Sequence, residues 1–145
     1  IEGRDPGANF PDSELYDAGD SIASSVMIAP SAVQAGLINN LDEAYAYIRS
    51  FDWEKLKCLR DAAIKDGLHG SADGVEVVHF TRNILEIAAK GLQPSEQAML
   101  TYPQWVLETG ENGADRALQF VESQRGSQKK ALQELIKRRA VVFQL

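Results

Sequence analysis

The side chains best suited to nucleophilic or metal chemistry are those of Cys58, His69 and His79. The two histidines are ten residues apart, whereas a helical metal site needs ligands about four residues apart and a carboxylate or thiolate beside them. Cys58 has no neighbouring base in the sequence that would activate its thiol. We therefore interpret His69 as a loop residue, His79 as a helix-surface residue and Cys58 as a packed helix residue, and we predict no catalytic or metal-binding residue.

Three further polar segments have a binding interpretation and a structural one. Gly110-Glu111-Asn112-Gly113 precedes a helix and could cradle an anion, but adjacent acidic residues oppose a phosphate, which favours a plain helix–helix connection. A basic strip near the end of the chain is typical of a solvated face that complements a helix C-terminus. Four carboxylates near the start of the chain are interpreted as groups that complement the positive N-terminal end of a helix dipole, rather than as ligands of a metal ion. The basic residues are Lys129, Lys130, Lys137, Arg138 and Arg139, and the acidic ones are Asp12, Glu14, Asp17 and Asp20.

Length and charge limit the class of protein. The 145 residues suit a single domain with a sizeable core, and 44% hydrophobic with 25% charged residues is an ordinary globular composition. The net charge of −6 argues against a nucleic-acid partner. No apolar run is long enough to cross a membrane, and the single cysteine fits a reducing compartment. We expect a cytoplasmic protein with no nucleic-acid or membrane partner.

Hydrophobic periodicity predicts an all-α fold, an irregular orthogonal bundle of about seven helices. Asp12 or Ser13 caps the first helix and Asp52 caps the fourth. The third helix is predicted to turn Ala44, Tyr45 and Ile48 inward, and Gly67 to end the fourth in a left-handed conformation. The β-branched residues at 75–80 are also compatible with a strand, although the apolar stripe that follows them favours a helix. The predicted helices are 13–29, 31–38, 42–50, 53–65, 75–90, 94–109 with a bend at Tyr102-Pro103, 114–124 and 127–139.

These elements divide the chain into an irregular lead at 1–11, a helical domain at 12–139 and an apolar tail at 140–145. The tail places four apolar side chains within five residues, and exposed apolar groups of this kind require cover. We predict that they form an interface with this domain or with another chain, including a second copy. The four are Val141, Val142, Phe143 and Leu145.

The first residues, Ile1-Glu2-Gly3-Arg4-Asp5-Pro6-Gly7, have two interpretations. Ile-Glu-Gly-Arg is the recognition sequence of the protease factor Xa, so it is either a cleavage remnant without function or native sequence. If it is native, Glu2 and Arg4 are the polar pair that we would assign to ligand binding.

The native interpretation is supported by a resemblance to the C-terminal part of bacterial glutamate–cysteine ligases. Their catalytic core is followed by Glu-Gly-Arg, one residue, Pro-Gly, and then by helices. Further segments are similar in the same order: Trp53–Arg60 with Gly67-Leu68-His69-Gly70, Ile84–Leu92, and Val106-Leu107-Glu108-Thr109-Gly110 with Ala114–Leu118. Together these cover most of residues 50–120, whereas residues 12–40 depart from the family pattern.

The resemblance implies a helical portion that packs on an ATP-dependent, magnesium-binding catalytic core, which precedes this portion in the family. It implies no cofactor in this chain, whose partner is then another protein domain. The alternative is a self-contained helical interaction module with no catalytic role.

Overall fold

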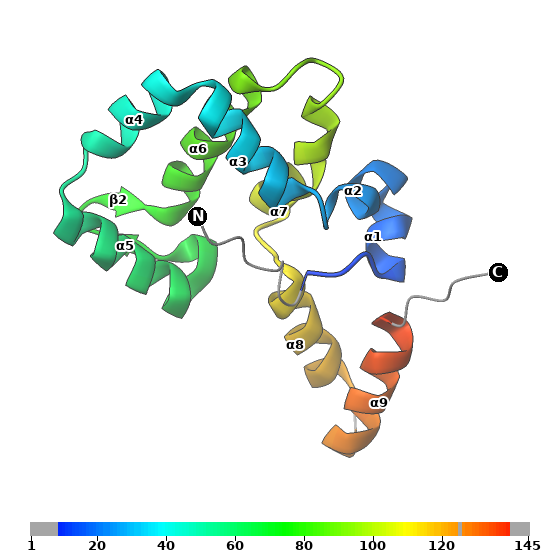
Figure 1. Cartoon of the computed structure of the whole chain (residues 1–145). Helices are drawn as coiled ribbons and strands as arrows, with labels where there is room; N and C mark the ends of the chain where they lie inside the picture. Colours follow the sequence, from blue (N-terminus) through cyan, green and yellow to red (C-terminus); the bar gives the residue numbers. More distant parts are fainter. Residues whose placement is uncertain (1–8, 125, 140–145) are drawn as a thin grey trace.

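The computed structural model describes residues 9–124 and 126–139, and its fold is all-α. The described part contains nine α-helices rather than about seven, two short 3-10 helices and one very small hairpin (Figure 1). The helices are α1 Ser13–Ala18, α2 Asp20–Ser25, α3 Ala29–Asn39, α4 Leu41–Arg49, α5 Trp53–Asp66, α6 Val77–Gly91, α7 Thr101–Thr109, α8 Gly113–Ser123 and α9 Gln128–Arg139. The 3-10 helices are η1 Gly67–His69 and η2 Gln97–Leu100, and the strands are β1 Ser71–Ala72 and β2 Val75–Glu76.

The predicted first helix is wrong as a single element, because Gly19 divides it into α1 and α2. Gly19 adopts φ 157° and ψ 139°, which an interior helical residue cannot have. The cap is as predicted: the Asp12 carboxylate accepts the N–H of Leu15 at 3.1 Å. Leu15 and Val26 then pack with Ala23 and Tyr102 in one apolar cluster.

The predicted fourth helix is confirmed as α5, which Asp52 caps through the N–H of Lys55 at 2.8 Å. Gly67 has φ 59° as expected, but its ψ of −137° lies outside the left-handed helical region. Val75 and Glu76 form β2, so the helix starts at Val77. The predicted sixth helix is also shorter, because α7 begins only at Thr101 and accommodates Pro103 within its first turn.

Helices α3 and α6 cross at the centre of the fold, and glycines allow their backbones to touch (Figure 1). A Cβ on Gly36 would lie 2.2 Å from the carbonyl oxygen of Ala88, and one on Gly91 would lie 1.9 Å from that of Gly36. Asn39 donates to the Gly91 carbonyl and Asn40 to that of Ile87, both at 3.1 Å. These bonds join the end of α3 to the last turn of α6, and the Gly91 carbonyl is one that the helix itself leaves without a donor.

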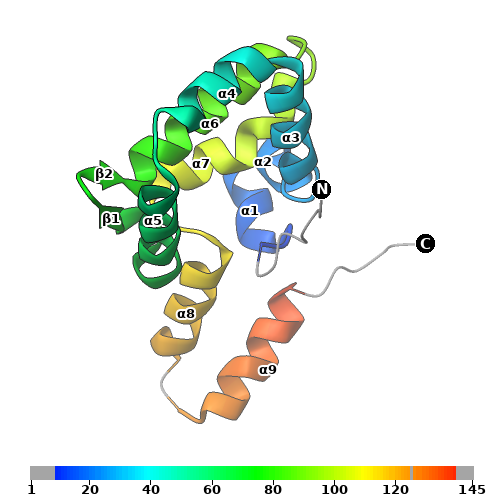
Figure 2. The same cartoon turned by 60° about the vertical axis from the view of Figure 1, so that its left-hand side comes forward.

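Helices α8 and α9 form a hairpin, here called the arm, that projects from the remaining helices in both views (Figures 1 and 2). The two helices pack chiefly on each other. Among the described residues, no helix is long and apolar enough to span a membrane.

Candidate functional site

Cys58, His69 and His79, the side chains best suited to nucleophilic or metal chemistry, do not come together in the described structure. Cys58 is exposed on α5, and its thiol has no hydrogen-bond partner within the described residues. His79 Nδ1 lies 3.1 Å from Glu76 Oε2 on the surface, whereas His69 faces Gly110 across a cleft. No group of three or more histidine, cysteine, aspartate or glutamate side chains in the described ranges could hold a metal ion.

The exposure of Cys58 corrects the prediction that it packs as an apolar residue. Leu59, its neighbour, takes the buried position on α5 instead. We expect a thiol reagent to modify Cys58 in the native protein at a rate within about tenfold of that in denaturant, because nothing shields the sulfur. Rates measured by mass spectrometry in both states test this. Strong protection in the native state would contradict the exposed position.

The sequence missed a buried charged cluster that ties the arm to the start of α1. Arg116 of α8 has a side chain only 1% exposed, and Asp12 has one 4% exposed. Asp12 Oδ2 lies 3.9 Å from Arg116 Nη2 and 3.6 Å from Arg139 Nε. Arg139 was predicted to be solvated with the rest of the basic strip, but it also donates to the Gly113 carbonyl at 2.6 Å.

Arg116 has unusual surroundings for a buried cation. None of its three side-chain nitrogens makes a hydrogen bond to the described residues, and its guanidinium lies 5.2 Å from the Trp105 ring centroid. Burial raises the pKa of the neighbouring Tyr102 phenol, an effect that Arg116 partly offsets. The guanidinium thus depends on the Asp12 charge and on the aromatic face for its stabilisation.

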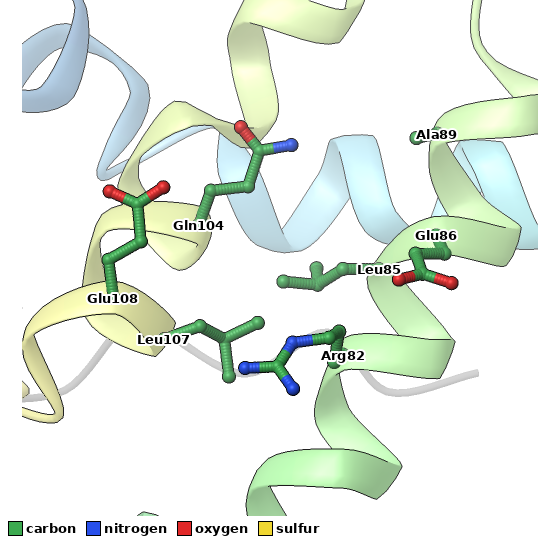
Figure 3. Close-up of a pocket in the computed structure, with 7 residues that line it drawn as sticks. All are labelled: Arg82, Leu85, Glu86, Ala89, Gln104, Leu107 and Glu108. Carbon is green, nitrogen blue, oxygen red and sulfur yellow. The ribbon is translucent and has the colours of Figure 1, made fainter.

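A groove of about 330 Å³ lies between α6 and α7 (Figure 3). Its apolar wall is formed by Leu85, Ala89 and Leu107. Arg82 and Glu86 border it from α6, and Gln104 and Glu108 from α7, as Figure 3 shows. This volume is at the small end of the range for ligand pockets, so it suits one or two side chains better than a nucleotide.

A second cleft, of about 520 Å³, lies between the end of α5 and the start of α8. Its polar groups are largely occupied with one another. Asn112 accepts the N–H of Asp115, whose carboxylate accepts that of Asn112 at 2.9 Å, and Glu111 accepts from Gln119 at 2.9 Å. The segment 110–113 therefore acts as a helix connection with a capping box.

An exposed apolar surface runs along α4 to the start of α5, on the described helices that precede the arm, here called the body. We call it the α4–α5 face, and it consists of Leu41, Tyr45, Ile48 and Trp53. Leu41, Tyr45 and Trp53 are 62%, 60% and 70% exposed. A hollow of about 440 Å³ between Ile48 and Trp53 continues it.

The inward positions predicted for Tyr45 and Ile48 are therefore wrong, although Ala44 is buried as expected. Tyr47 and Phe51 take the inner side instead, because their rings pack with Phe80 of α6 at centroid distances of 5.7 and 5.5 Å and with each other at 5.3 Å. The Glu43–Lys90 ion pair fixes the same side, and it lowers the pKa of Glu43 together with a hydrogen bond from Asn40. These contacts leave the α4–α5 face without a partner in the described part of the chain.

The remaining predicted site residues lie outside the described ranges. They are Glu2 and Arg4, predicted for ligand binding, and Val141, Val142, Phe143 and Leu145, predicted for an interface. Comparisons of the chain with protein-family models, curated proteins and solved structures gave no match.

Proposed function

We propose that this chain is a non-catalytic helical docking domain that packs on the ATP-dependent core of a glutamate–cysteine ligase-like enzyme. The observation that carries the docking role is the α4–α5 face. Large apolar patches on a protein surface mark interaction sites, and tryptophan and tyrosine are the residues that contribute most to protein–protein binding. The ordered resemblance across residues 50–120 supports the choice of partner.

The shape of the face fits a protein surface rather than a small substrate. Leu41, Tyr45 and Ile48 follow one another at helical spacing, so they form a stripe along α4. Arg49 lies 5.5 Å from the centroid of the Tyr45 ring and gives the stripe a polar border. An apolar centre with a polar rim is the usual organisation of a protein interface.

The proposal predicts that substituting the stripe abolishes binding without unfolding the domain. We expect the triple variant Leu41→Gln, Tyr45→Gln, Trp53→Gln to bind the purified catalytic core of a bacterial glutamate–cysteine ligase at least about 100-fold more weakly than the unsubstituted chain. Each side chain is mostly exposed, so the thermal midpoint should change little. Isothermal titration calorimetry and circular dichroism measure the two quantities.

The matched control is Tyr16→Gln, because Tyr16 is a 52% exposed aromatic residue of α1, a helix that lies away from α4 (Figure 1). This variant should bind as the unsubstituted chain does. If the folded, unsubstituted chain does not bind the core, the choice of partner is wrong. Equal loss of binding in the control and the triple variant would show that the α4–α5 face is not the docking site.

A further inference from the structure

The charge of this chain is divided between two regions. The first 110 residues hold 17 of the 21 acidic residues and 8 of the 15 basic ones, whereas the last 35 hold 4 acidic and 7 basic residues. Helix α9 alone carries Lys129, Lys130, Lys137, Arg138 and Arg139 against the single acid Glu134. The arm and the body are therefore electrostatically complementary, and this complementarity can act between two molecules.

Helix α9 also presents apolar side chains that nothing in the described structure covers. Leu132 and Ile136 are 51% and 69% exposed, and their spacing of four places them one turn apart on the same face. Lys129 precedes Leu132 by one turn on that face. A basic helix with an apolar edge binds surfaces that are both acidic and apolar.

The α6–α7 groove has these two properties. Its wall of Leu85, Ala89 and Leu107 can receive an aliphatic side chain, and Glu86 and Glu108 stand on opposite sides of it (Figure 3). Neither glutamate makes a hydrogen bond or ion pair within the described residues, nor does Arg82 at the same rim. Two carboxylates against one guanidinium leave the rim net negative.

The arm does not fill the groove of its own chain. Contacts of Arg139 with Asp12 at 3.6 Å and of Arg138 with Glu14 at 3.8 Å hold the end of α9 beside α1. In both views the arm projects away from α6 (Figures 1 and 2). We propose that α9 of one copy docks in the α6–α7 groove of a second copy, with Leu132 and Ile136 on the apolar wall and Lys129 and Lys137 near Glu86 and Glu108.

The expected dimer is reciprocal, because a two-fold axis makes the same contact twice. Each contact is small, so the dimer should be weak and in rapid exchange. Ion pairs at its rim are screened by salt, which should raise the dissociation constant. This inference does not rest on the α4–α5 face or on the ligase partner.

Charge reversal on each side tests the pairing by sedimentation velocity. We expect both Lys129→Glu, Lys137→Glu and Glu86→Lys, Glu108→Lys to raise the dissociation constant of the dimer by at least about tenfold. An equimolar mixture of these two variants should form a heterodimer that pairs opposite charges at both contacts, one as in the unsubstituted chain and one with the charges exchanged. Its affinity should return toward that of the unsubstituted dimer. The control variant Lys55→Glu, Lys65→Glu, which reverses two exposed charges on α5, should still dimerise.

Three results would overturn the proposal. One is an unsubstituted chain that stays monomeric at low salt and millimolar concentration. Another is an unchanged dissociation constant for the Glu86→Lys, Glu108→Lys variant, which would show that the arm does not bind in the α6–α7 groove. The third is a mixture of reversed variants that shows no heterodimer although circular dichroism shows both to be folded.

Discussion

Replacing Asp12 by asparagine is expected to lower the free energy of unfolding by about 3–5 kcal/mol, because it removes the anion that compensates a buried guanidinium. Arg116 is 1% exposed at its side chain, and Asp12 supplies its only ion pair among the described residues. The loss of the Asp12 charge should destabilise the Arg139 guanidinium less, because its side chain is 16% exposed and also donates to the Gly113 carbonyl. Urea unfolding followed by circular dichroism measures the change.

The substitution to asparagine removes the negative charge of Asp12 but keeps its role as a helix cap, because aspartate and asparagine cap helices about equally well. The matched control is Asp52→Asn, because Asp52 caps α5 with the same geometry in an exposed position. It should cost no more than about 1 kcal/mol. Equal losses for the two variants would mean that Asp12 acts only as a cap. Adding Arg116→Met to Asp12→Asn should recover part of the loss, since the uncompensated charge is then gone.

The second large effect is expected for Gly36→Ala, which should destabilise the fold by about 3 kcal/mol, at the upper end of the usual cost of overpacking. The added methyl would lie 2.2 Å from the Ala88 carbonyl oxygen and 2.8 Å from its carbonyl carbon. These are backbone atoms, so α3 and α6 must separate to make room. The higher helix propensity of alanine, about 1 kcal/mol, opposes this cost without cancelling it.

Ala35→Ser is the control for this variant. It adds one heavy atom to the exposed neighbouring position of α3, and it should change stability by about 0.5 kcal/mol. Thermal and urea unfolding of the two variants give the comparison. A Gly36→Ala protein as stable as the unsubstituted chain would show that the two helices do not touch as described.

The sequence predicted those helices for which the capping residues and the apolar stripe indicate the same first and last residues. The fourth helix is the clearest example, because Asp52 and Gly67 mark both ends within the sequence itself. The capping box of α8 carries a similar signal in Asn112 and Asp115, which are three residues apart in the sequence. The break between α1 and α2 was marked by Gly19, but a glycine within an apolar stripe does not by itself end a helix.

Long-range contacts decided what the sequence could not predict. Ile48 lies four residues after Ala44, which is the spacing of a buried stripe, and nothing local marks the adjacent Tyr45 as exposed. The aromatic contacts of Tyr47 and Phe51 with Phe80 turn the other side of α4 inward. Arg116 resembles any surface arginine of an amphipathic helix. Its burial depends on Asp12 and Trp105, which no local pattern connects to it. The α4–α5 face and the buried cluster therefore became visible only in the assembled fold.

The way in which the arm is attached has a consequence for the order of folding. The contact of Leu15 with Tyr102 brings the start of the chain beside α7, and it thereby shortens the loop that must close before Arg116 and Arg139 meet Asp12. The crossing of α3 and α6 and the clusters around Leu15 and Leu100 form without the arm. Helices α8 and α9 should therefore join last during folding and detach first during unfolding, as a separate cooperative unit among the described helices.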